Sequence, residues 1–293
     1  MIKYNEGYLF ILPFVIGLII INIYSRFYSV FVSFMKWDGS KSPAVFIGLS
    51  NYIRLVHDKY FFMSIGNTWI MWLCGFIPQM VIALWLAVVL NDEHLKGRSI
   101  FRAIFYLPNL ITMASIGALF SFILDWQTGS LNKLLMSMHI ISHKVNWLQS
   151  PAATRGTVSF TLWWIWFGYS MIIFMAGLKT ISSDYYDAAC VDGASKWQSF
   201  KYITLPLLQP TILYQVVTSV IGGLTLFDVP FVLSGGNGAP LYKSLTMVMY
   251  LYNTAFKNYN FGYSGAIGVG LFIMVAILVG ISFKVIYKKK VYE

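Results

Sequence analysis

The sequence predicts an all-α polytopic membrane protein with six transmembrane helices. Of its 293 residues, 58% are hydrophobic and only 11% are charged, and the mean hydropathy is +0.67. Soluble globular domains carry about 25% charged residues, so this composition excludes that class. A helix needs about 20 residues to cross a hydrocarbon core of about 30 Å. Six apolar runs reach that length, at 8–31, 68–90, 100–124, 157–178, 211–233 and 265–286.

Each run is expected to be a helix, because a helix satisfies its own backbone hydrogen bonds in lipid. The runs are continuous rather than alternating, which excludes a transmembrane barrel. The first run is too long for a secretory signal, and no small-residue cleavage site is found up to Arg26 and the aromatic residues after it. It is therefore expected to remain as the first span of a single membrane domain that covers 1–293.

Three long connections are expected on the outer side, after the first, third and fifth runs. The connection 33–61 holds a turn at Trp37-Asp38-Gly39 and then a short amphipathic helix. The connection 125–156 is polar with aromatic anchors at the interface. The connection 234–262 opens with a glycine-rich turn.

Basic residues near the ends of the runs orient the chain, because cytoplasmic segments carry an excess of Lys and Arg. With both termini inside, the shorter inner segments hold eleven basic residues and the longer outer loops hold nine. The density of positive charge therefore favours cytoplasmic termini, with Lys3 and the tail Lys288-Lys289-Lys290 inside. Membrane topology also explains the net charge of +10 better than nucleic-acid binding does.

A polar segment, 184–206, separates the fourth and fifth runs. Asp184 is expected to cap a short helix, and Gly193 to end that helix with a positive φ. A second helix is expected from Ala194 until Pro206, which closes it. Its apolar face would consist of Trp197, Phe200 and Ile203, a pattern suited to a membrane interface.

This segment resembles the cytoplasmic coupling segment of binding-protein-dependent ABC importer permeases. The family pattern runs E-A-A, two residues, D-G-A, five residues, F, two residues, I-x-L-P, and the chain matches it from Asp187, which replaces Glu, to Pro206. The resemblance implies the fold of a type I ABC importer permease, with this segment as a coupling helix that docks on an ATPase. The residues placed in that contact are Tyr186, Asp187, Ala188, Ala189, Asp192, Gly193, Ala194, Phe200, Leu205 and Pro206.

Other stretches resemble the carbohydrate-uptake permeases, the maltose, multiple-sugar and glycerol-phosphate members of this class. They lie at 46–52, 101–108, 174–181, 227–236 and 254–266. The family's G-G-G-P element takes the form here of Gly235-Gly236-Asn237-Gly238, with Pro240 two positions later. The resemblance implies a multi-pass subunit of the bacterial cell (inner) membrane. Its partners would be a homologous permease, two ATP-binding subunits and an extracytoplasmic solute-binding protein.

The chain contains no G-x-x-x-x-G-K-[ST] phosphate-binding loop, so we expect it to bind no ATP and to hold no catalytic residue. ATP and Mg would be used by the partner ATPase subunits. No cofactor or metal site is expected, because neither Cys74 nor Cys190 has the spacing of a disulfide or a metal site. The same holds for the scattered loop histidines His57, His94, His139 and His143.

Alignment with the maltose-type branch places the substrate pathway on the fourth and fifth runs. The aromatic stretch 163–169 fits either interfacial packing or a platform for a sugar ring. Asp228 would be costly in lipid, so it is expected to face the pathway, a helix partner or the outer water layer. The pathway residues implied by the resemblance are Phe167, Gly168, Met171, Ser219, Gly223 and Asp228.

Three alternatives to a sugar importer stay open. An ABC permease for another solute, such as glycerol phosphate, a polyol or a peptide, would share these motifs, although the few intramembrane cations disfavour a phosphate ester. A secondary transporter would show duplicated halves or many intramembrane charges, and the sequence shows neither. A membrane enzyme would need a His, Cys or Lys partner for Asp228, and none is suitably placed.

Overall fold

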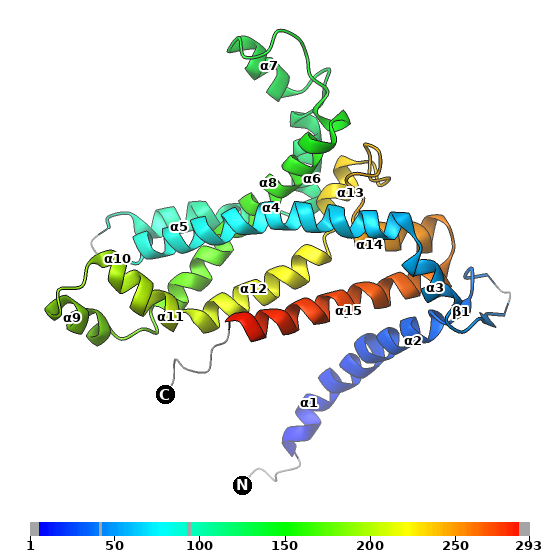
Figure 1. The fold of residues 1–293 in the computed structure, drawn as a ribbon, viewed down its shortest axis with the longest axis horizontal. Coiled ribbons are helices and arrows are strands. Elements are labelled where there is room, and N and C mark those ends of the chain that lie inside the picture. The colour runs from blue at the N-terminus through cyan, green and yellow to red at the C-terminus, as the bar shows by residue number, and fades with distance from the viewer. Residues whose placement is uncertain (1–5, 41–42, 93–94, 287–293) are drawn as a thin grey trace. The chain divides into compact units, whose positions relative to one another are not determined.

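The computed structural model describes residues 6–40, 43–92 and 95–286. The chain divides into two compact units, one of Met1–Phe61 with Tyr250–Ile273 and one of Phe62–Met249 with Met274–Glu293. Helices make up almost all of the regular structure, which confirms the all-α prediction (Figure 1). The expected single domain over 1–293 stays a prediction. Lys3, His94 and the tail Lys288-Lys289-Lys290 lie outside the described residues.

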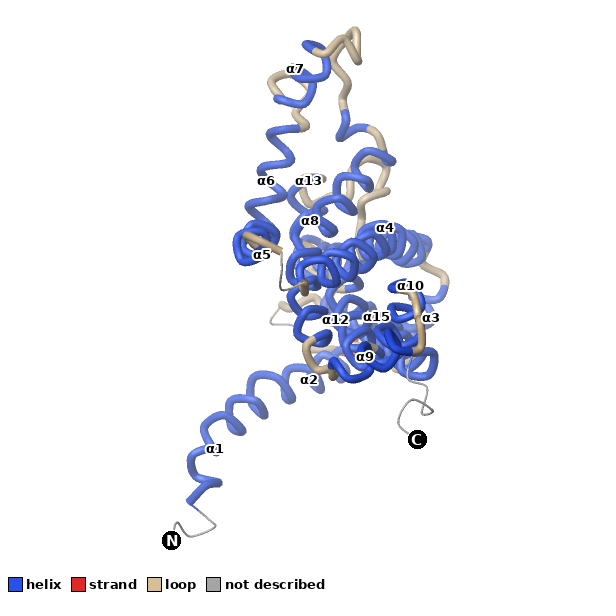
Figure 2. The backbone as a smooth tube through the Cα atoms, turned by 90° about the vertical axis from the view of Figure 1, so that its left-hand side faces the viewer, coloured by secondary structure: helices blue, strands red, loops and turns tan. Residues whose placement is uncertain are grey.

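The first unit begins with a long helical segment. Helix α1 (Glu6–Gly17) passes through a π-helical turn, η1 (Leu18–Ile23), into α2 (Tyr24–Val32), as Figure 2 shows. Together they form the candidate membrane span Tyr8–Val32, which matches the first apolar run. Strands β1 (Met35–Lys36) and β2 (Val45–Phe46) then pair antiparallel, and α3 (Ser50–Val56) follows them.

A buried asparagine holds this connection together. Asn51 on α3 donates through Nδ2 to the carbonyl oxygens of Ser33 at 2.8 Å and Met35 at 2.9 Å. Gly262, near the start of α15 (Phe261–Ile286), lies so close to the Met35 carbonyl that a Cβ there would collide with it. The π-helical turn η5 (Asn253–Lys257) also belongs to this unit. The first unit is therefore fixed by main-chain contacts as well as by apolar packing.

The second unit is built on three long apolar helices, α4 (Lys59–Leu90), α8 (Pro151–Leu178) and α12 (Gln209–Leu224). Each matches one of the predicted apolar runs, and α15 matches the last of them. One buried cluster joins α4 and α8 near the end of α4, and another lies near the start of α8. The first cluster includes Ala83, Ala87, Leu90, Met171 and Phe174, and the second includes Met71, Val158, Leu162, Leu226 and Val229.

The third predicted run is not one straight helix. Helix α5 (Arg98–Tyr106), with the 3₁₀ turn η2 (Leu107–Leu110), meets α6 (Met113–Ile123) at a bend of 89°. Ile111 is extended and Thr112 caps α6 by accepting from the amide of Ser115, so the helical path stops after η2. The expectation of a continuous helix over 100–124 is therefore wrong. Among the described residues five helices are long and apolar enough to cross a membrane, or up to six if this bent pair is one span.

The fifth predicted run is also interrupted. Helix α12 ends at Leu224, and a short helix, α13 (Asp228–Leu233), begins after a break at 225–227. Asp228 is thus an exposed residue in the first turn of α13, inside the candidate membrane span Gln209–Leu233 and next to its break. The connections that the sequence predicts to lie outside also hold α7 (Ser130–Ser137), η3 (Trp147–Gln149) and α14 (Met247–Tyr252).

Candidate functional site

The polar segment between α8 and α12 begins with the short helix α9 (Ser183–Val191). Ser182 is its N-cap, since its hydroxyl oxygen accepts from the amide of Asp184 at 3.3 Å. The expectation that Asp184 caps this helix is wrong. Asp184 lies in the first turn instead, where its carboxylate is favoured by the helix dipole. Gly193 follows the helix with φ +76°, as predicted.

The second helix of this segment begins with a capping box. Ser195 Oγ accepts from the amide of Gln198 at 3.3 Å, and Gln198 Oε1 accepts from the amide of Ser195 at 2.7 Å. Helix α10 (Lys196–Ser199) then leads through a π-helical turn, η4 (Phe200–Thr204), into α11 (Leu205–Leu207). The helix therefore starts at the position that the sequence indicates, close to Ala194.

Pro206 does not close this helix, contrary to the expectation. In the π-helical turn the amide of Leu205 bonds to the carbonyl of Phe200, which widens the backbone before the proline. Helical hydrogen bonds then continue on the far side of Pro206, from the Leu208 amide to the Thr204 carbonyl and from Ile212 to Leu208, both 2.9 Å. The segment thus runs into α12 with only one non-helical residue, Leu208.

The residues expected to contact an ATPase lie on this segment with different exposures. Asp187, Ala188, Asp192 and Gly193 are exposed, and they lie on α9 and the turn that follows it. The remaining six, Tyr186, Ala189, Ala194, Phe200, Leu205 and Pro206, are half-buried. The segment therefore presents a surface of small residues with two carboxylates.

A contact between the two short helices gives this segment a fixed shape. The hydroxyls of Tyr186 on α9 and Thr204 in η4 lie 3.0 Å apart in a hydrogen bond. On the second helix, the rings of Trp197 and Phe200 stack with centroids 5.5 Å apart. Trp197 is nevertheless exposed, so the segment also offers an aromatic surface.

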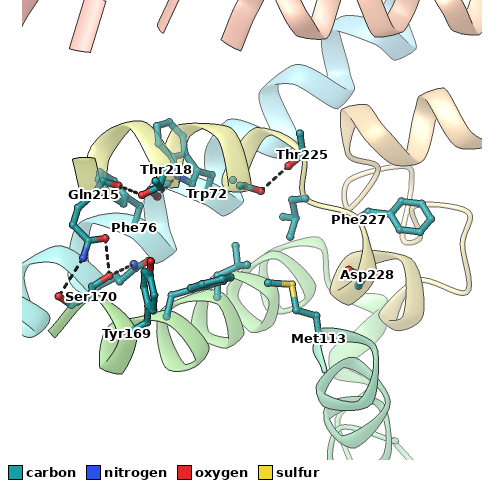
Figure 3. A pocket seen from close by; sticks show the side chains of 17 residues that line it. Trp72, Phe76, Met113, Tyr169, Ser170, Gln215, Thr218, Thr225, Phe227 and Asp228 are labelled. Atoms are coloured by element: carbon teal, nitrogen blue, oxygen red, sulfur yellow. Dashed lines mark hydrogen bonds between the residues drawn. The ribbon is translucent and has the colours of Figure 1, made fainter. Parts of the chain in front are cut away.

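A cavity of about 410 Å³ lies in the second unit, between α4, α8, α12 and the start of α13 (Figure 3). Its lining combines aromatic rings with uncharged polar groups. Figure 3 shows Ser170 and Gln215 at one end and Asp228 at the other. The aromatic members are Trp72, Phe76, Trp166, Tyr169 and Phe227, and the uncharged polar members are Gln79, Ser170, Gln215, Thr218, Ser219 and Thr225.

A buried hydrogen-bond network joins three helices at one end of the cavity. Gln79 Nε2 on α4 donates to Ser170 Oγ on α8 at 2.8 Å. Ser170 Oγ donates to Gln215 Oε1 on α12 at 3.3 Å, and Gln215 Nε2 donates to the Ser170 carbonyl at 3.2 Å. All three side chains are buried, so each depends on the others for its hydrogen bonds.

The structure brings together three of the six expected pathway residues. Ser219, Gly223 and Asp228 line the cavity. The other three lie on α8 outside this lining, and their roles stay predictions. Phe167 stacks on Trp163, Gly168 packs against the Phe105 carbonyl, and Met171 is fully buried in the cluster near the end of α4.

Several lining residues were not singled out from the sequence, chiefly Trp72, Gln79 and Gln215, whereas Trp166 and Tyr169 belong to the aromatic stretch 163–169, for which a sugar platform was one of two interpretations. A signal for the two glutamines exists, because a polar side chain inside an apolar run is costly in lipid unless it faces other protein or a cavity. Trp72 carries no such signal in a chain with 18% aromatic residues.

The charge of the cavity limits what it can bind. Asp228 is the one ionisable acidic lining residue, and no Lys or Arg is among the lining residues. Aromatic faces with hydroxyl and amide groups suit an uncharged, hydroxyl-rich molecule. In the part of the chain that the structure describes, no three His, Cys, Asp or Glu side chains gather to hold a metal ion.

Comparisons with known proteins agree on one class. The family described as binding-protein-dependent transport system inner membrane component matches residues 79–292. The lactose transport system permease protein of Rhizobium radiobacter is 31% identical over 97% of this chain and 95% of its own length. The arabinooligosaccharides transport system permease protein of Bacillus subtilis is 31% identical over 96% and 88% of the two chains.

A solved structure shares the fold. It is a bacterial alginate ABC transporter in complex with an alginate pentasaccharide-bound periplasmic protein. One chain of that complex superposes with a TM-score of 0.80 at 24% identity, over 96% of this chain and 94% of the other. At this identity the likeness shows the architecture of the chain.

Proposed function

This chain belongs to the family of binding-protein-dependent transport system inner membrane components, and from this premise we propose that it is the permease subunit of an ATP-driven importer of neutral oligosaccharides. Its family and its apolar helices make it a multi-pass protein of the inner membrane. In the proposal both termini are cytoplasmic, so the connections that hold α3, α7 and α14 face outward.

The proposed substrate class rests on the residues that line the 410 Å³ cavity. Its rings can stack on sugar faces, and its amides and hydroxyls can bond to sugar hydroxyls. A phosphate ester would need a cation, and the lining residues include neither Lys nor Arg. The names of the lactose and arabinooligosaccharide relatives support the same class. Glycerol phosphate is therefore a weaker candidate than a neutral sugar.

The proposed partners divide the work of transport. A homologous permease completes the pathway, an extracytoplasmic solute-binding protein delivers the sugar, and two ATPase subunits use ATP and Mg. The ATPase would contact the exposed carboxylates Asp187 and Asp192, which can pair with basic groups. Gly193 and the neighbouring alanines permit close approach. Closure of the ATPase dimer would then shift the helices between inward-open and outward-open states.

The test is ATPase activity of the complex purified through this subunit, in lipid, with its binding protein and a panel of solutes. The proposal expects an ATPase to co-purify and one neutral oligosaccharide to stimulate it. Stimulation only by glycerol phosphate or a polyol would replace the substrate class and leave the importer class standing. Failure of any ATPase to co-purify would contradict the docking of the segment between α8 and α12.

A further inference from the structure

A second cavity, of about 490 Å³, opens where α3 ends and α4 begins, entirely within the first unit. Three basic side chains, Arg54, His57 and Lys59, line it, and all three are exposed. The other lining residues are Ile53, Asp58, Tyr60 and Tyr250. We call this group of residues the basic basin.

The Asp58 carboxylate, which lines the basic basin, already accepts hydrogen bonds from other groups of the protein. Asp58 Oδ1 accepts from the amides of Tyr60 at 2.8 Å and Phe61 at 3.3 Å. Asp58 Oδ2 accepts from the hydroxyls of Tyr250 and Tyr263. Four donors fill the acceptor positions of one carboxylate, so Asp58 is not available to bind a cation or to pair with its basic neighbours.

The basic side chains have unused donors. The Arg54 guanidinium lies 4.0 Å from the centre of the Tyr263 ring, a cation–π contact that leaves its N–H groups at the edge. Within 6–40, 43–92 and 95–286, neither Arg54 nor Lys59 has a carboxylate at ion-pair distance. His57 Nδ1 lies 2.9 Å from the Ile53 carbonyl, which can only accept, so the Nδ1 proton is used within α3 and the unused donors are those of Arg54 and Lys59. The basic basin is therefore arranged to receive an anion.

The position of the basic basin along α4 favours a protein carboxylate over a lipid phosphate. Thr68, where the predicted apolar run begins, is nine positions after Lys59, and a helix rises about 14 Å over that length. The headgroup layer on one side of a bilayer is about 5–8 Å deep. With the hydrocarbon core starting at Thr68, Lys59 lies beyond the headgroups, at the level that a soluble protein reaches.

We propose that the basic basin binds the carboxylate of an Asp or Glu side chain on the soluble solute-binding protein and so positions that protein on this subunit. The inference rests on the proposed function, which supplies the soluble partner and places α3 on the outer side. Opposite charges at such a contact speed encounter and fix the register of docking.

The test measures ATPase activity of the complete complex in lipid against the concentration of sugar-loaded binding protein. Arg54→Gln and Lys59→Gln are introduced singly and together, and Lys36→Gln is the matched control. Lys36 is an exposed lysine in the same connection, outside the basic basin. The double variant is expected to need about tenfold more binding protein for half-maximal stimulation, with an unchanged maximal rate and a weaker salt dependence.

Three other outcomes would overturn the inference. The first is that the double variant needs no more binding protein than the wild type for half-maximal stimulation. The second is that Lys36→Gln raises this concentration as much as the double variant does, which would indicate general electrostatic attraction. A difference between wild type and variant that needs anionic lipid, and vanishes in purely zwitterionic bilayers, would assign the basic basin to lipid phosphate. If sugar-loaded binding protein does not stimulate the ATPase activity of the wild-type complex, the result contradicts the proposed function, and the inference that rests on it is contradicted as well.

Discussion

Trp72 on α4 and Gly223 on α12 are in direct contact, and the indole ring fills the space that a side chain at position 223 would need. The indole N–H also donates to Ser219 Oγ, one turn earlier on α12, at 3.0 Å. The ring also stacks on Phe76 with centroids 5.4 Å apart. One wall of the 410 Å³ cavity is therefore set by the absence of a side chain at Gly223.

Gly223→Ala is expected to displace the Trp72 ring and to reduce sugar uptake in proteoliposomes. Forcing a methyl group into a filled site typically costs about 1–3 kcal/mol, so the thermal unfolding midpoint of the purified complex should also fall. Gly222→Ala is the control, because a Cβ at that neighbouring lining position meets nothing within 4 Å. Equal behaviour of the two variants would show that the contact with Trp72 is unimportant.

Ser170→Ala is expected to destabilise the protein through the network at the end of the cavity. The change removes the hydroxyl that accepts from Gln79 and donates to Gln215. Buried polar groups that lose a partner cost about 1–3 kcal/mol. Thr218→Ala is the control, since that lining hydroxyl donates only to carbonyls of its own helix. Thermal unfolding in detergent measures the difference, and an equal loss in both variants would count against the network.

Variants at position 193 distinguish the effect of backbone geometry from that of side-chain contact in the segment proposed to dock on the ATPase. Gly193→Ala is expected to leave the complex in the membrane but to uncouple ATP hydrolysis from uptake, because φ is +76° there and alanine disfavours it. Gly193→Asn should retain more coupling, since asparagine tolerates this conformation. The measurement is the ratio of sugar transported to ATP hydrolysed. Normal coupling in Gly193→Ala would oppose the assignment of this turn to the ATPase contact.

The folding stability of the first unit is expected to depend on pH through the carboxyl group of Asp58. Burial acts to raise the pKa of Asp58, but hydrogen bonds from Tyr250, Tyr263 and two amides outweigh it and hold the pKa below its ordinary value of 3.8. A carboxyl with a depressed folded pKa stabilises the folded state above its unfolded pKa, and this contribution is lost as pH falls through the folded pKa.

The unfolding midpoint of the wild type is therefore expected to fall below about pH 4, the ordinary aspartate range, more steeply than that of Asp58→Asn. At neutral pH, Tyr250→Phe should cost about 1.5–3 kcal/mol, the typical value for one hydrogen bond to a charged group. Thermal unfolding across this pH range measures both effects. Identical pH profiles for wild type and Asp58→Asn would show that the hydrogen bonds to this carboxylate do not stabilise the fold.

The positions of the apolar helices follow from hydropathy, because only a long apolar run can be helical in lipid. The turn at Gly193 was also predictable, since glycine after a short helix is a strong signal. The cap at Ser182 was missed because Asp184 satisfies the same composition rule two residues later. Either the Ser182 hydroxyl or the Asp184 carboxylate could cap the N-terminus of α9, and only the backbone geometry determines which of them does.

The cavity was harder to predict than the spans. A helix such as α8 is apolar on every face, so its sequence does not indicate which side meets other helices. Met171 and Ser170 are adjacent, yet one lies in an apolar cluster and the other lines the cavity. The wider turn before Pro206 departs from the local signal of a proline, which usually ends a helix. The bend after η2 instead follows Pro108 and agrees with that signal, which hydropathy alone does not use.

The hydrogen bonds that carry the backbone past Pro206 have a mechanical consequence. Between Lys196 and Ser219 the main chain contains no loop, and the only non-helical residue, Leu208, is bonded on both sides at 2.9 Å. A flexible linker would absorb a displacement at one end by changing its conformation, whereas this path is hydrogen-bonded along most of its length. A displacement at Trp197 is therefore passed along hydrogen-bonded helix toward Ser219, and Leu208 is the one position in this path where the backbone leaves the helix.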